Sequence, residues 1–595
     1  MKDFFKHVAA TIVGIFGFGI IMGILGFISL LGMLCNSSKP SLKSNTVLVM
    51  KLNGEITDRT EENIWGKLKG DASTTLGMTD ILSAIKKAEK EDKVKGIYLE
   101  MDGVQTDYAT LEEIRHALDH FKRSGKWIIA YADNYTQGDY YLASIANKVF
   151  INPEGSIDWH GLAAQSQYLK DVAAKFGVRF QVVKVGKYKS FTETYTEDKM
   201  SDANREQLDR CLKGTWKEIL ASVAKSRGIS QDSLNHYADG LMAFDDTKKL
   251  KTRHMVDGFC YYDQIKKEVK AQLNIDIDRP IHQASISEIN DIVADKHEGE
   301  TIAVYYCQGN IVQTASSNNW GRVQEIVSTK VIKDLEALGD DDDVKAVVLR
   351  INSGGGDAYA SEQIWRAVKE LDRKKPVVVS MGGMTASGAY YMSMGARALY
   401  ADRTTLTGSI GIFGVLPDLS ELMTKKLGFK YDEVKTHANS GYTLAGTARP
   451  WSPTEVAALQ NMVNRGYALF RKRVADGRKT NVEEIEKLAQ GRVWLGEDAL
   501  SNKLIDRQGG LDAAIAYAAH LAKFDSDSDY HTEDYPAPAS WMDQLIDEAT
   551  DAHSSYLSEQ LQLTLGEYYK PFMWIHSIKE RKPVQASLPY VIDIK

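Results

Sequence analysis

One serine of the sequence, Ser387, lies among small residues at the point where an expected strand ends and an expected helix begins. Ser387 follows the apolar run 376–380 and stands between Ala386 and Gly388, so its hydroxyl would be accessible. At a helix start, free backbone N–H groups and the helix dipole favour negative charge. Ser387 is therefore a candidate nucleophile, although serine is also the usual residue of an ordinary helix N-cap. This stretch alone favours the N-cap without excluding the nucleophile.

A glycine-rich turn earlier in the chain could supply the complementary half of a catalytic site. Residues 352–357 (NSGGGD) follow an apolar strand, and consecutive glycines let main-chain N–H groups approach a ligand closely. Such a turn suits a phosphate or an oxyanion, but the Gly-Lys-Ser/Thr of a Walker loop is missing. Together with Ser387 it predicts a nucleophile beside an oxyanion hole, where one donor typically contributes about 3 kcal/mol.

A nucleophilic serine needs a base to take its proton. The 13 histidines are scattered, and His437 is the nearest candidate in the same half of the chain. Lys189 is a second candidate, at the end of a strand in the run 182–190 (VVKVGKYKS). A lysine has a pKa near 10.4, so it could act as a base only if burial lowered that pKa.

The elements that must position these residues alternate between strands and helices, the pattern of α/β folds with largely parallel sheets. Four pairs of segments match in order at spacings of 250 to 253 residues: 94–101 with 344–351, 138–141 with 388–391, 155–157 with 408–410, and 183–184 with 434–435. A constant spacing predicts two copies of one fold. We place them at 46–297 and 298–522.

The two copies differ at the residues that could do chemistry. Gln137 stands in the first copy where the second has Ser387, and the turn 101–104 (MDGV) keeps a single glycine. Lys189 matches Ser440 of the second copy, so the lysine is peculiar to the first. Each copy alone therefore lacks half of the candidate site.

The N-terminus predicts a membrane anchor. Residues 8–34 carry no charge, and as a helix they would be about 40 Å long, more than the ~30 Å hydrocarbon core. Lys2 and Lys6 precede this run and favour a cytoplasmic N-terminus. A cleaved signal peptide is the alternative, but the run is long and no A-x-A site follows it. We expect residues 1–45 to be a cytoplasmic N-terminus and anchor, with the rest outside the cytoplasm.

Composition excludes several other classes of protein. The net charge of −7, from 73 basic and 80 acidic residues, argues against a nucleic-acid coat. The four cysteines lie far apart, which disfavours a zinc ribbon and a disulfide scaffold. We expect no metal and no cofactor. Residues 523–595 are interpreted as a linker and a C-terminal extension for packing or assembly.

Four segments carry a family resemblance: 385–391 (TASGAYY), 407–414 (TGSIGIFG), 351–356 (INSGGG) and 186–190 (GKYKS). With them the chain resembles the signal peptide peptidase A (protease IV) family in its double-length form, within the Clp-protease/crotonase-like superfamily. The resemblance covers about 46–520. It implies an α/β fold of the ClpP/crotonase type, duplicated in tandem behind one N-terminal transmembrane helix.

The resemblance also implies roles for individual residues. It makes the protein a serine endopeptidase with a Ser/Lys dyad, in which Ser387 is the nucleophile and Lys189 the general base. Ser409 would orient the lysine, and the Gly355 and Gly388 N–H groups would form the oxyanion hole. The family usually has proline where this chain has Gly354, so we expect a more flexible loop that affects the rate more than the mechanism.

Substrates and partners follow from the same resemblance. It implies that the protein degrades cleaved signal peptides and other apolar peptides at the cytoplasmic (inner) membrane. The expected form is a homotetramer of single-pass subunits, each in contact with lipid through its N-terminal helix. No binding of nucleic acid is expected. Two alternatives stay open. One is a catalytically decayed membrane scaffold, against which the intact Ser387 and Lys189 argue. The other is a crotonase-type acyl-CoA enzyme, which would be cytoplasmic and would use carboxylates as acid and base.

Overall fold

The computed structural model describes residues 41–60, 75–293, 299–315, 324–526, 529–537 and 585–587, together with Gly14, Phe18 and Met22. The predicted anchor at 8–34 otherwise falls outside these residues, as does most of the chain after 537. Within the described ranges, no helix is long and apolar enough to cross a membrane.

The first copy is built on a parallel sheet in the order β2-β1-β3-β4-β5-β7, with β8 also paired to β1. Its strands are β1 (Thr46–Thr57), β2 (Leu76–Gly77), β3 (Val94–Gln105), β4 (Trp127–Ala132), β5 (Lys148–Ile151), β6 (Arg179–Lys184), β7 (Gly258–Phe259) and β8 (His282–Ser285). Its helices are α3 (Met78–Lys90), α4 (Tyr108–Arg123), α5 (Gln137–Ala143), α6 (Lys170–Lys175), η1 (Ser190–Thr192), α7 (Glu193–Thr196), α8 (Asp202–Arg227), α9 (Gln231–Asp239), η2 (Met242–Phe244), α10 (Lys248–Thr252), α11 (Ile265–Leu273) and α12 (Ile286–Ile292).

The second copy repeats this plan in an eight-stranded sheet with the path β18-β16-β14-β12-β9-β20, in which β15 also pairs with β14 and β19 pairs with β15. Its strands are β9 (Glu300–Gln308), β10 (Asn310–Val312), β11 (Glu325–Val327), β12 (Val344–Ser353), β13 (Gly355–Asp357), β14 (Val377–Ala386), β15 (Ala398–Ala401), β16 (Leu406–Gly408), β17 (Phe413–Asp418), β18 (Val493–Leu495), β19 (Arg507–Gln508) and β20 (Tyr530–Tyr535). Its helices are α13 (Ser328–Asp340), α14 (Ala358–Lys374), α15 (Gly388–Ser393), η3 (Leu422–Lys426), η4 (Tyr442–Leu444), α16 (Pro453–Gly477), α17 (Val482–Leu488), α18 (Gly496–Ser501) and α19 (Leu511–Leu521).

Strand register demonstrates the duplication. Ile97 of β3 pairs with Ile128 of β4, and Val347 of β12 pairs with Val377 of β14, so equivalent partners lie about 250 residues apart in both strands. The path β1-β3-β4-β5-β7 is repeated as β9-β12-β14-β15-β19. Even β20, which follows residue 522, repeats the parallel pairing of β8 by joining β9. The predicted tandem α/β fold is confirmed.

The fourth sequence match does not yield the same structure in both copies. Val183 lies in β6 and is buried, whereas Val434 is fully exposed in an irregular segment. The difference has a physical cause, because β6 hydrogen-bonds to β17 along its whole length, and no strand pairing among the described residues includes 428–435. An apolar strand needs a partner to keep its shape.

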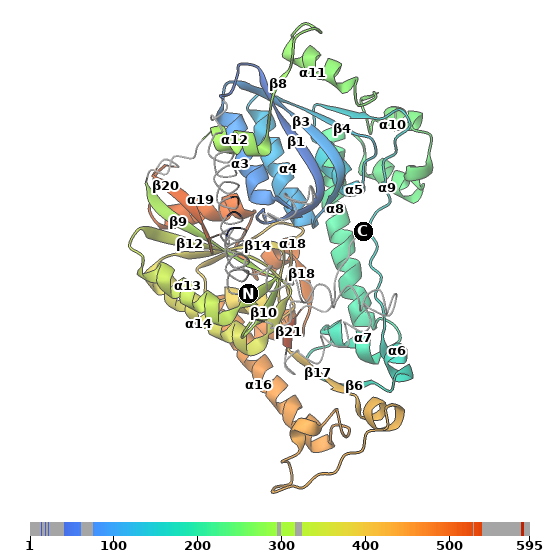
Figure 1. Ribbon diagram of the computed structural model, residues 1–595, viewed down its shortest axis with the longest axis vertical. Coiled ribbons are helices and arrows are strands. Elements are labelled where there is room, and N and C mark those ends of the chain that lie inside the picture. The colour runs from blue at the N-terminus through green and yellow to red at the C-terminus, as the bar shows by residue number, and fades with distance from the viewer. Residues whose placement is uncertain are drawn as a thin grey trace, which may run out of the picture.

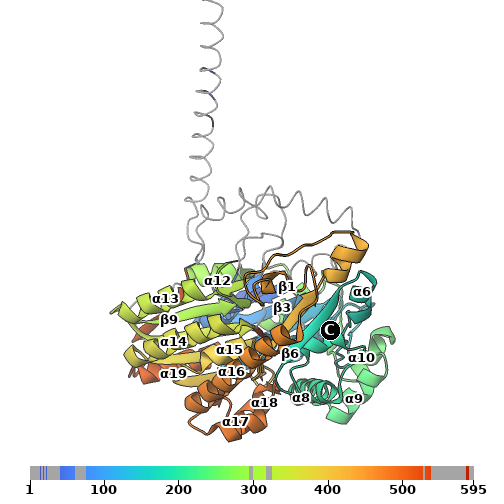
Figure 2. The same cartoon turned by 90° about the horizontal axis from the view of Figure 1, so that it is seen from below.

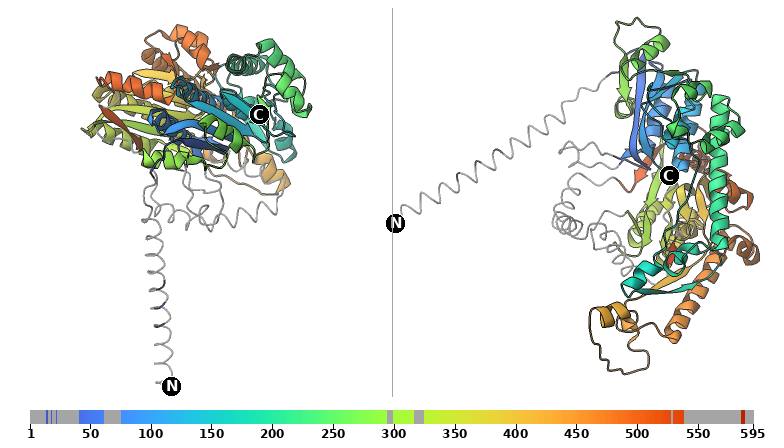
Figure 3. Two further views of the ribbon diagram at one scale, coloured as in Figure 1. Left: turned by 90° about the horizontal axis from the view of Figure 1, so that it is seen from above. Right: turned by 90° about the vertical axis from the view of Figure 1, so that its right-hand side faces the viewer.

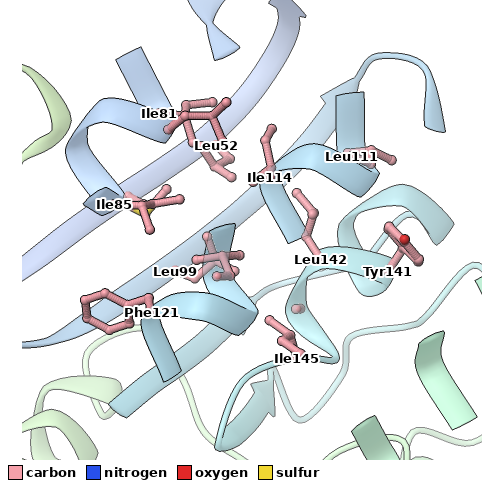
Figure 4. Packing of buried hydrophobic residues seen from close by; sticks show 14 of the residues in the cluster. Leu52, Ile81, Ile85, Leu99, Leu111, Ile114, Phe121, Tyr141, Leu142 and Ile145 are labelled. Atoms are coloured by element: carbon pink, nitrogen blue, oxygen red, sulfur yellow. The ribbon is translucent and has the colours of Figure 1, made fainter. Parts of the chain in front are cut away.

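Helices on the sheet build the core of the first copy (Figure 4). Ile85 of α3 and Ile114 and Phe121 of α4 face Leu52 and Leu99 of β1 and β3. All five side chains are buried, and burying each contributes roughly 1.5–3 kcal/mol. Their 3.6-residue spacing on the helices and the continuous apolar strands explain why the elements pack in layers.

A third sheet ties the copies together in the order β11-β10-β13-β21-β17-β6. Here β6 of the first copy pairs antiparallel with β17 of the second, from Lys184 opposite Phe413 to Arg179 opposite Asp418. Figure 1 shows these two strands side by side in the lower part of the molecule, and Figure 2 shows α16 next to β6. The strand β21 (Gln585–Ser587) comes from the far end of the chain.

The long helix α8 also bridges the copies. It belongs to the first copy, where it contacts α5, and it packs against β18 of the second. Figure 3 shows it running along the side of the molecule past both sheets. Because α8 directly follows the segment around Lys189, this helix fixes the position of that segment relative to the second copy.

A buried ion-pair network lies where the copies meet. Arg350 of β12 is fully buried, with Asp58 at 2.9 Å and Glu113 at 2.7 Å, both from the first copy. Burial opposes the charge on Arg350, but the two carboxylates outweigh this effect and raise its pKa. Neither carboxylate could be left alone in this interior, because an unpaired buried charge is strongly unfavourable.

Arg350→Met should therefore destabilise the protein. Removing the guanidinium leaves two buried carboxylates without a counter-charge, and we expect a loss of about 3–5 kcal/mol in the free energy of unfolding. The measurement is urea unfolding at neutral pH. Arg373→Met is the matched control, because its pair with Glu370 is exposed and should change stability by less than about 0.5 kcal/mol. Equal effects of the two variants would contradict the prediction.

Candidate active site

Ser387 sits on a strained turn between β14 and α15. Its φ is +56° and its ψ is −113°, a conformation that residues other than glycine rarely adopt. The turn is held by a hydrogen bond from the Ser387 N–H to the Gly408 carbonyl at 2.8 Å. The side chain makes no capping hydrogen bond to α15, so the ordinary N-cap interpretation does not describe it. In this backbone conformation the hydroxyl does not cap the helix.

Lys189 meets this hydroxyl from the other copy. Its Nζ donates to Ser387 Oγ at 2.8 Å, across 198 positions of sequence. It also donates to the Ser409 carbonyl at 3.1 Å and to Ser409 Oγ at 2.9 Å. Both serines and the lysine are fully buried. The structure thus brings together three of the residues that the sequence singled out.

Burial alone lowers the pKa of Lys189 well below its ordinary value of 10.5. No carboxylate contributes to the shift, and the ring of Phe413 lies 5.8 Å from Nζ. A cation without a counter-charge in such an interior loses its proton more readily. The neutral amine can donate its two N–H groups in hydrogen bonds to Ser409 and direct its lone pair at the Ser387 hydroxyl.

Residues that the sequence did not flag hold the lysine in place. A Cβ on Gly491 would lie 2.7 Å from both the N and the Cβ atom of Lys189, so only glycine permits this approach. Behind the lysine, Ser190 donates to Asn204, and Gln207 Nε2 donates to the Tyr188 carbonyl at 3.1 Å. No local sequence motif predicts these supporting residues, because they lie in α8 and in a loop about 300 residues further along the chain.

Ser409→Ala tests how much the second hydroxyl contributes. Losing one acceptor for the Lys189 amine should lower kcat about 10-fold, equivalent to ~1.4 kcal/mol, with little change in KM. Because Ser409 Oγ stabilises the ammonium form, its removal should also move the acid limb of the pH–rate profile to lower pH. Ser393→Ala is the control, since its hydroxyl bonds only the Ala389 carbonyl. An unchanged pH profile would exclude the orienting role.

The glycine-rich turn closes the site from the opposite side. Gly355 has φ +99°, and a Cβ built on it would lie 2.6 Å from the Gly388 nitrogen, so the two expected oxyanion glycines are adjacent. The Gly355 N–H donates to Ser353 Oγ at 3.1 Å, within its own loop. Ser353 in turn donates to the Gly309 carbonyl at 2.6 Å. This hydrogen bond holds the loop that we expected to be more flexible because Gly354 replaces proline.

The equivalent pocket of the first copy is filled by its own side chains. Asp139 accepts hydrogen bonds from the N–H groups of Gly103 and Val104, the turn that replaces the glycine-rich loop. Gln137, in place of the serine, accepts from the N–H of Gly161 at 2.9 Å. Its helix begins with an ordinary capping box at Thr136, without strain. At these positions the first copy therefore offers no hydroxyl in place of Ser387, and the amides of Gly103 and Val104 are already bonded.

The structure does not bring His437 to Ser387, nor Lys187, the lysine two positions before Lys189 in the same run. His437 is exposed, and its ring contacts neighbouring Thr436 Oγ1 at 3.0 Å. Lys187 is exposed, with its Nζ 4.8 Å from the Tyr188 ring centroid. Among the described residues one group has metal-ligand spacing, namely Glu112, His116 and Asp402. This group belongs to the polar interface between the copies, where burial raises the pKa of Glu112 to about 7.

A hydroxyl beside a deprotonatable amine, at a turn that precedes a helix start and lies next to a glycine-rich loop, is suited to acyl transfer. The fold and the site thus define a serine hydrolase of the ClpP-like α/β class.

Comparison with known proteins narrows this class. The model of Peptidase family S49 matches residues 120–276 and again 369–525, and the Clp protease model matches 302–409. The chain is 35% identical to Protease 4 of Salmonella typhi, covering 89% of this chain and 86% of that one. It is 33% identical to Protease 4 of Haemophilus influenzae (84% and 83%) and 30% identical to the chloroplastic serine protease SPPA of Arabidopsis thaliana (81% and 70%). The chain belongs to peptidase family S49 and is a serine peptidase.

Proposed function

We propose that this serine peptidase is a membrane-anchored endopeptidase that uses a Ser/Lys dyad to degrade cleaved signal peptides. The observation that carries the proposal is the 2.8 Å hydrogen bond between Lys189 Nζ and Ser387 Oγ, two fully buried groups from different copies of the fold. A lysine with a lowered pKa and a serine on a strained turn are the two parts that such a dyad requires.

The reaction would begin with neutral Lys189 taking the hydroxyl proton of Ser387 while Oγ attacks the peptide carbonyl. The Gly388 and Gly355 N–H groups would hold the oxyanion, with Gly355 exchanging its bond to Ser353. Lys189 then returns the proton to the leaving amine, and water, activated by the same amine, hydrolyses the acyl-enzyme.

An extended apolar peptide fits the surroundings of the dyad. The site lies between β13 and β17, whose backbones can both pair with a strand placed between them. Phe413 lies in β17, and α15, which carries Ala389 of a buried apolar cluster, contacts β13. Signal peptides have apolar cores, and an anchor at 8–34 would keep the site near the membrane that holds them.

Self-association, proposed as a homotetramer, is supported by one surface. Leu427, Phe429, Tyr431 and Val434 are exposed in a segment whose last residues repeat the sequence of β6. In the first copy that sequence is a strand paired with β17 of the second. The exposed repeat would gain an equivalent partner from another subunit, which would also bury its apolar side chains.

The experiment compares two synthetic peptides with the full-length enzyme in lipid vesicles. One is a signal peptide with an apolar core, and the other has the same length with two core residues changed to Asp. We expect cuts inside the core, located by mass spectrometry, and at least a 10-fold lower rate for the polar peptide. Flotation of the enzyme with the vesicles tests the anchor. Equal rates, or cuts only outside the core, would overturn the substrate assignment.

A further inference from the structure

The helix α4 turns a polar face towards the second copy. Leu111 and Ile114 pack in the core of the first copy (Figure 4), whereas 3.6 residues per turn place Glu112 and His116 together on the opposite side of the helix. The Glu112 carboxylate accepts hydrogen bonds across the interface from the Thr404 N–H at 3.2 Å and the Thr404 hydroxyl at 2.9 Å. Glu112 therefore fixes α4 to the turn that follows β15.

The same turn buries a carboxylate that has no partner. Asp402 is 1% exposed, and among the described residues neither of its side-chain oxygens has a hydrogen-bond partner. The carboxylates of Glu112 and Glu113 lie close by and repel its charge. The guanidinium of Arg350 is already engaged by two other carboxylates. A buried anion in these surroundings is strongly unfavourable unless a cation or a proton neutralises it.

Three ligand atoms converge at this carboxylate. One oxygen of Glu112, one oxygen of Asp402 and one ring nitrogen of His116 all lie within 4.8 Å of one another. Nitrogen and oxygen ligands of a tetrahedral Zn²⁺ lie about 3.4 Å apart, so small side-chain rotations would close the group around an ion. His116 is exposed, which gives an ion a way in from solvent and leaves the fourth position to water.

The donor set favours a transition metal. Imidazole is a good ligand for Zn²⁺ and similar ions, whereas Mg²⁺ and Ca²⁺ prefer sites built from oxygen alone. The two carboxylates supply two negative charges, which balance a divalent ion. Arg403 stands next to Asp402 in the chain, but its guanidinium is directed at Glu218 and Glu497, each at 3.6 Å.

We propose that Glu112, His116 and Asp402 bind one divalent transition-metal ion, best matched by Zn²⁺, that joins the two copies. The ion neutralises the buried carboxylate and holds α4 on the turn after β15. β16 follows this turn and ends at Gly408, whose carbonyl accepts the Ser387 N–H. The ion thus stabilises the segment that positions the nucleophile. We expected no metal from the sequence, because the ligands lie far apart in the chain.

The test is Zn²⁺ binding to the full-length enzyme, prepared without a histidine tag and dialysed against EDTA. Calorimetric titration should find one ion per chain, and added Zn²⁺ should raise the midpoint of thermal unfolding. His116→Gln, a change at an exposed position, should bind at least about 100-fold more weakly, since loss of even an outer partner of a ligand costs 10- to 100-fold. His120→Gln is the matched control, because this exposed histidine lies one turn further along α4, pairs with Glu89 and should leave binding unchanged.

Asp402→Asn separates the ion from its alternative, a proton shared between Asp402 and Glu113. With an ion at the site, this variant should lose the Zn²⁺-dependent rise in the thermal midpoint. A wild-type chain without saturable Zn²⁺ binding, or binding that survives in His116→Gln, would overturn the proposal. An equal effect of Mg²⁺ would overturn the assignment of a transition metal. Ser387→Ala should bind Zn²⁺ like the wild type, so the outcome is independent of the peptidase function.

Discussion

A Ser387→Ala enzyme should lose on the order of 10⁴- to 10⁶-fold in kcat, because it lacks the hydroxyl that forms the acyl-enzyme. Folding should survive, since alanine removes only the oxygen that Lys189 contacts at 2.8 Å. We expect the free energy of unfolding to change by no more than about 1.5 kcal/mol. The measurements are hydrolysis of a fluorogenic apolar peptide and urea unfolding of the same preparation.

Ser393→Ala provides the control for this loss. It removes a buried hydroxyl from the end of α15, where Ser393 bonds the Ala389 carbonyl within the helix. Its activity should remain within a few-fold of the wild type. If Ser387→Ala retained a comparable activity, Ser387 would not be the nucleophile, and labelling of the wild type by a serine-reactive probe would have to be traced to another residue.

Lys189→Met should inactivate the enzyme to a similar extent, because methionine has nearly the same length but cannot take a proton. Lys189→Arg should be inactive as well, since a guanidinium stays protonated at any pH at which the protein is folded. Peptide hydrolysis by both variants, beside the exposed Lys187→Met as control, checks the prediction. Activity in Lys189→Met would place the base elsewhere, and His437 would be the next residue to test.

The lowered pKa of Lys189 has consequences for pH dependence. The rate should rise with pH through an inflection below 10.5, because only the neutral amine acts as a base. The free energy of unfolding should also depend on pH through the titration of Lys189. The unfolded chain binds the Lys189 proton up to about pH 10.4, whereas the folded chain releases it earlier, so wild-type stability rises with pH across this window. Lys189→Met should lack this rise and should be more stable than the wild type on its acid side.

Much of the fold could be predicted from the sequence because it is repeated. The runs 94–101 and 344–351 are mostly apolar, as expected for strands of a parallel sheet, and both are central strands, β3 and β12. Ser387 and Lys189 stood out because each is present in one copy only. A position that loses its reactive group in one repeat is visible without any structure.

The remaining features depend on contacts between distant segments. The positive φ of Ser387 is imposed by its hydrogen bond to Gly408, and the low pKa of Lys189 by the packing of Gly491 and Phe413. The match of 183–184 with 434–435 correctly marked a repeat, yet it could not reveal that only one of the two segments has a strand partner. Nothing local in 585–587 predicts a strand, because its hydrogen bonds come from β13 and β17.

The carboxylate of Asp139 prevents the first copy from gaining a serine site of its own by a single substitution. A hydroxyl restored at Gln137 would face amides of Gly103 and Val104 that already bind a negative charge, and that charge would repel an oxyanion. Such a reversion brings no activity until Asp139 changes as well and a lysine reaches the pocket from another copy. No single substitution therefore supplies a second reactive centre, so the chain carries one such centre for two copies of the fold.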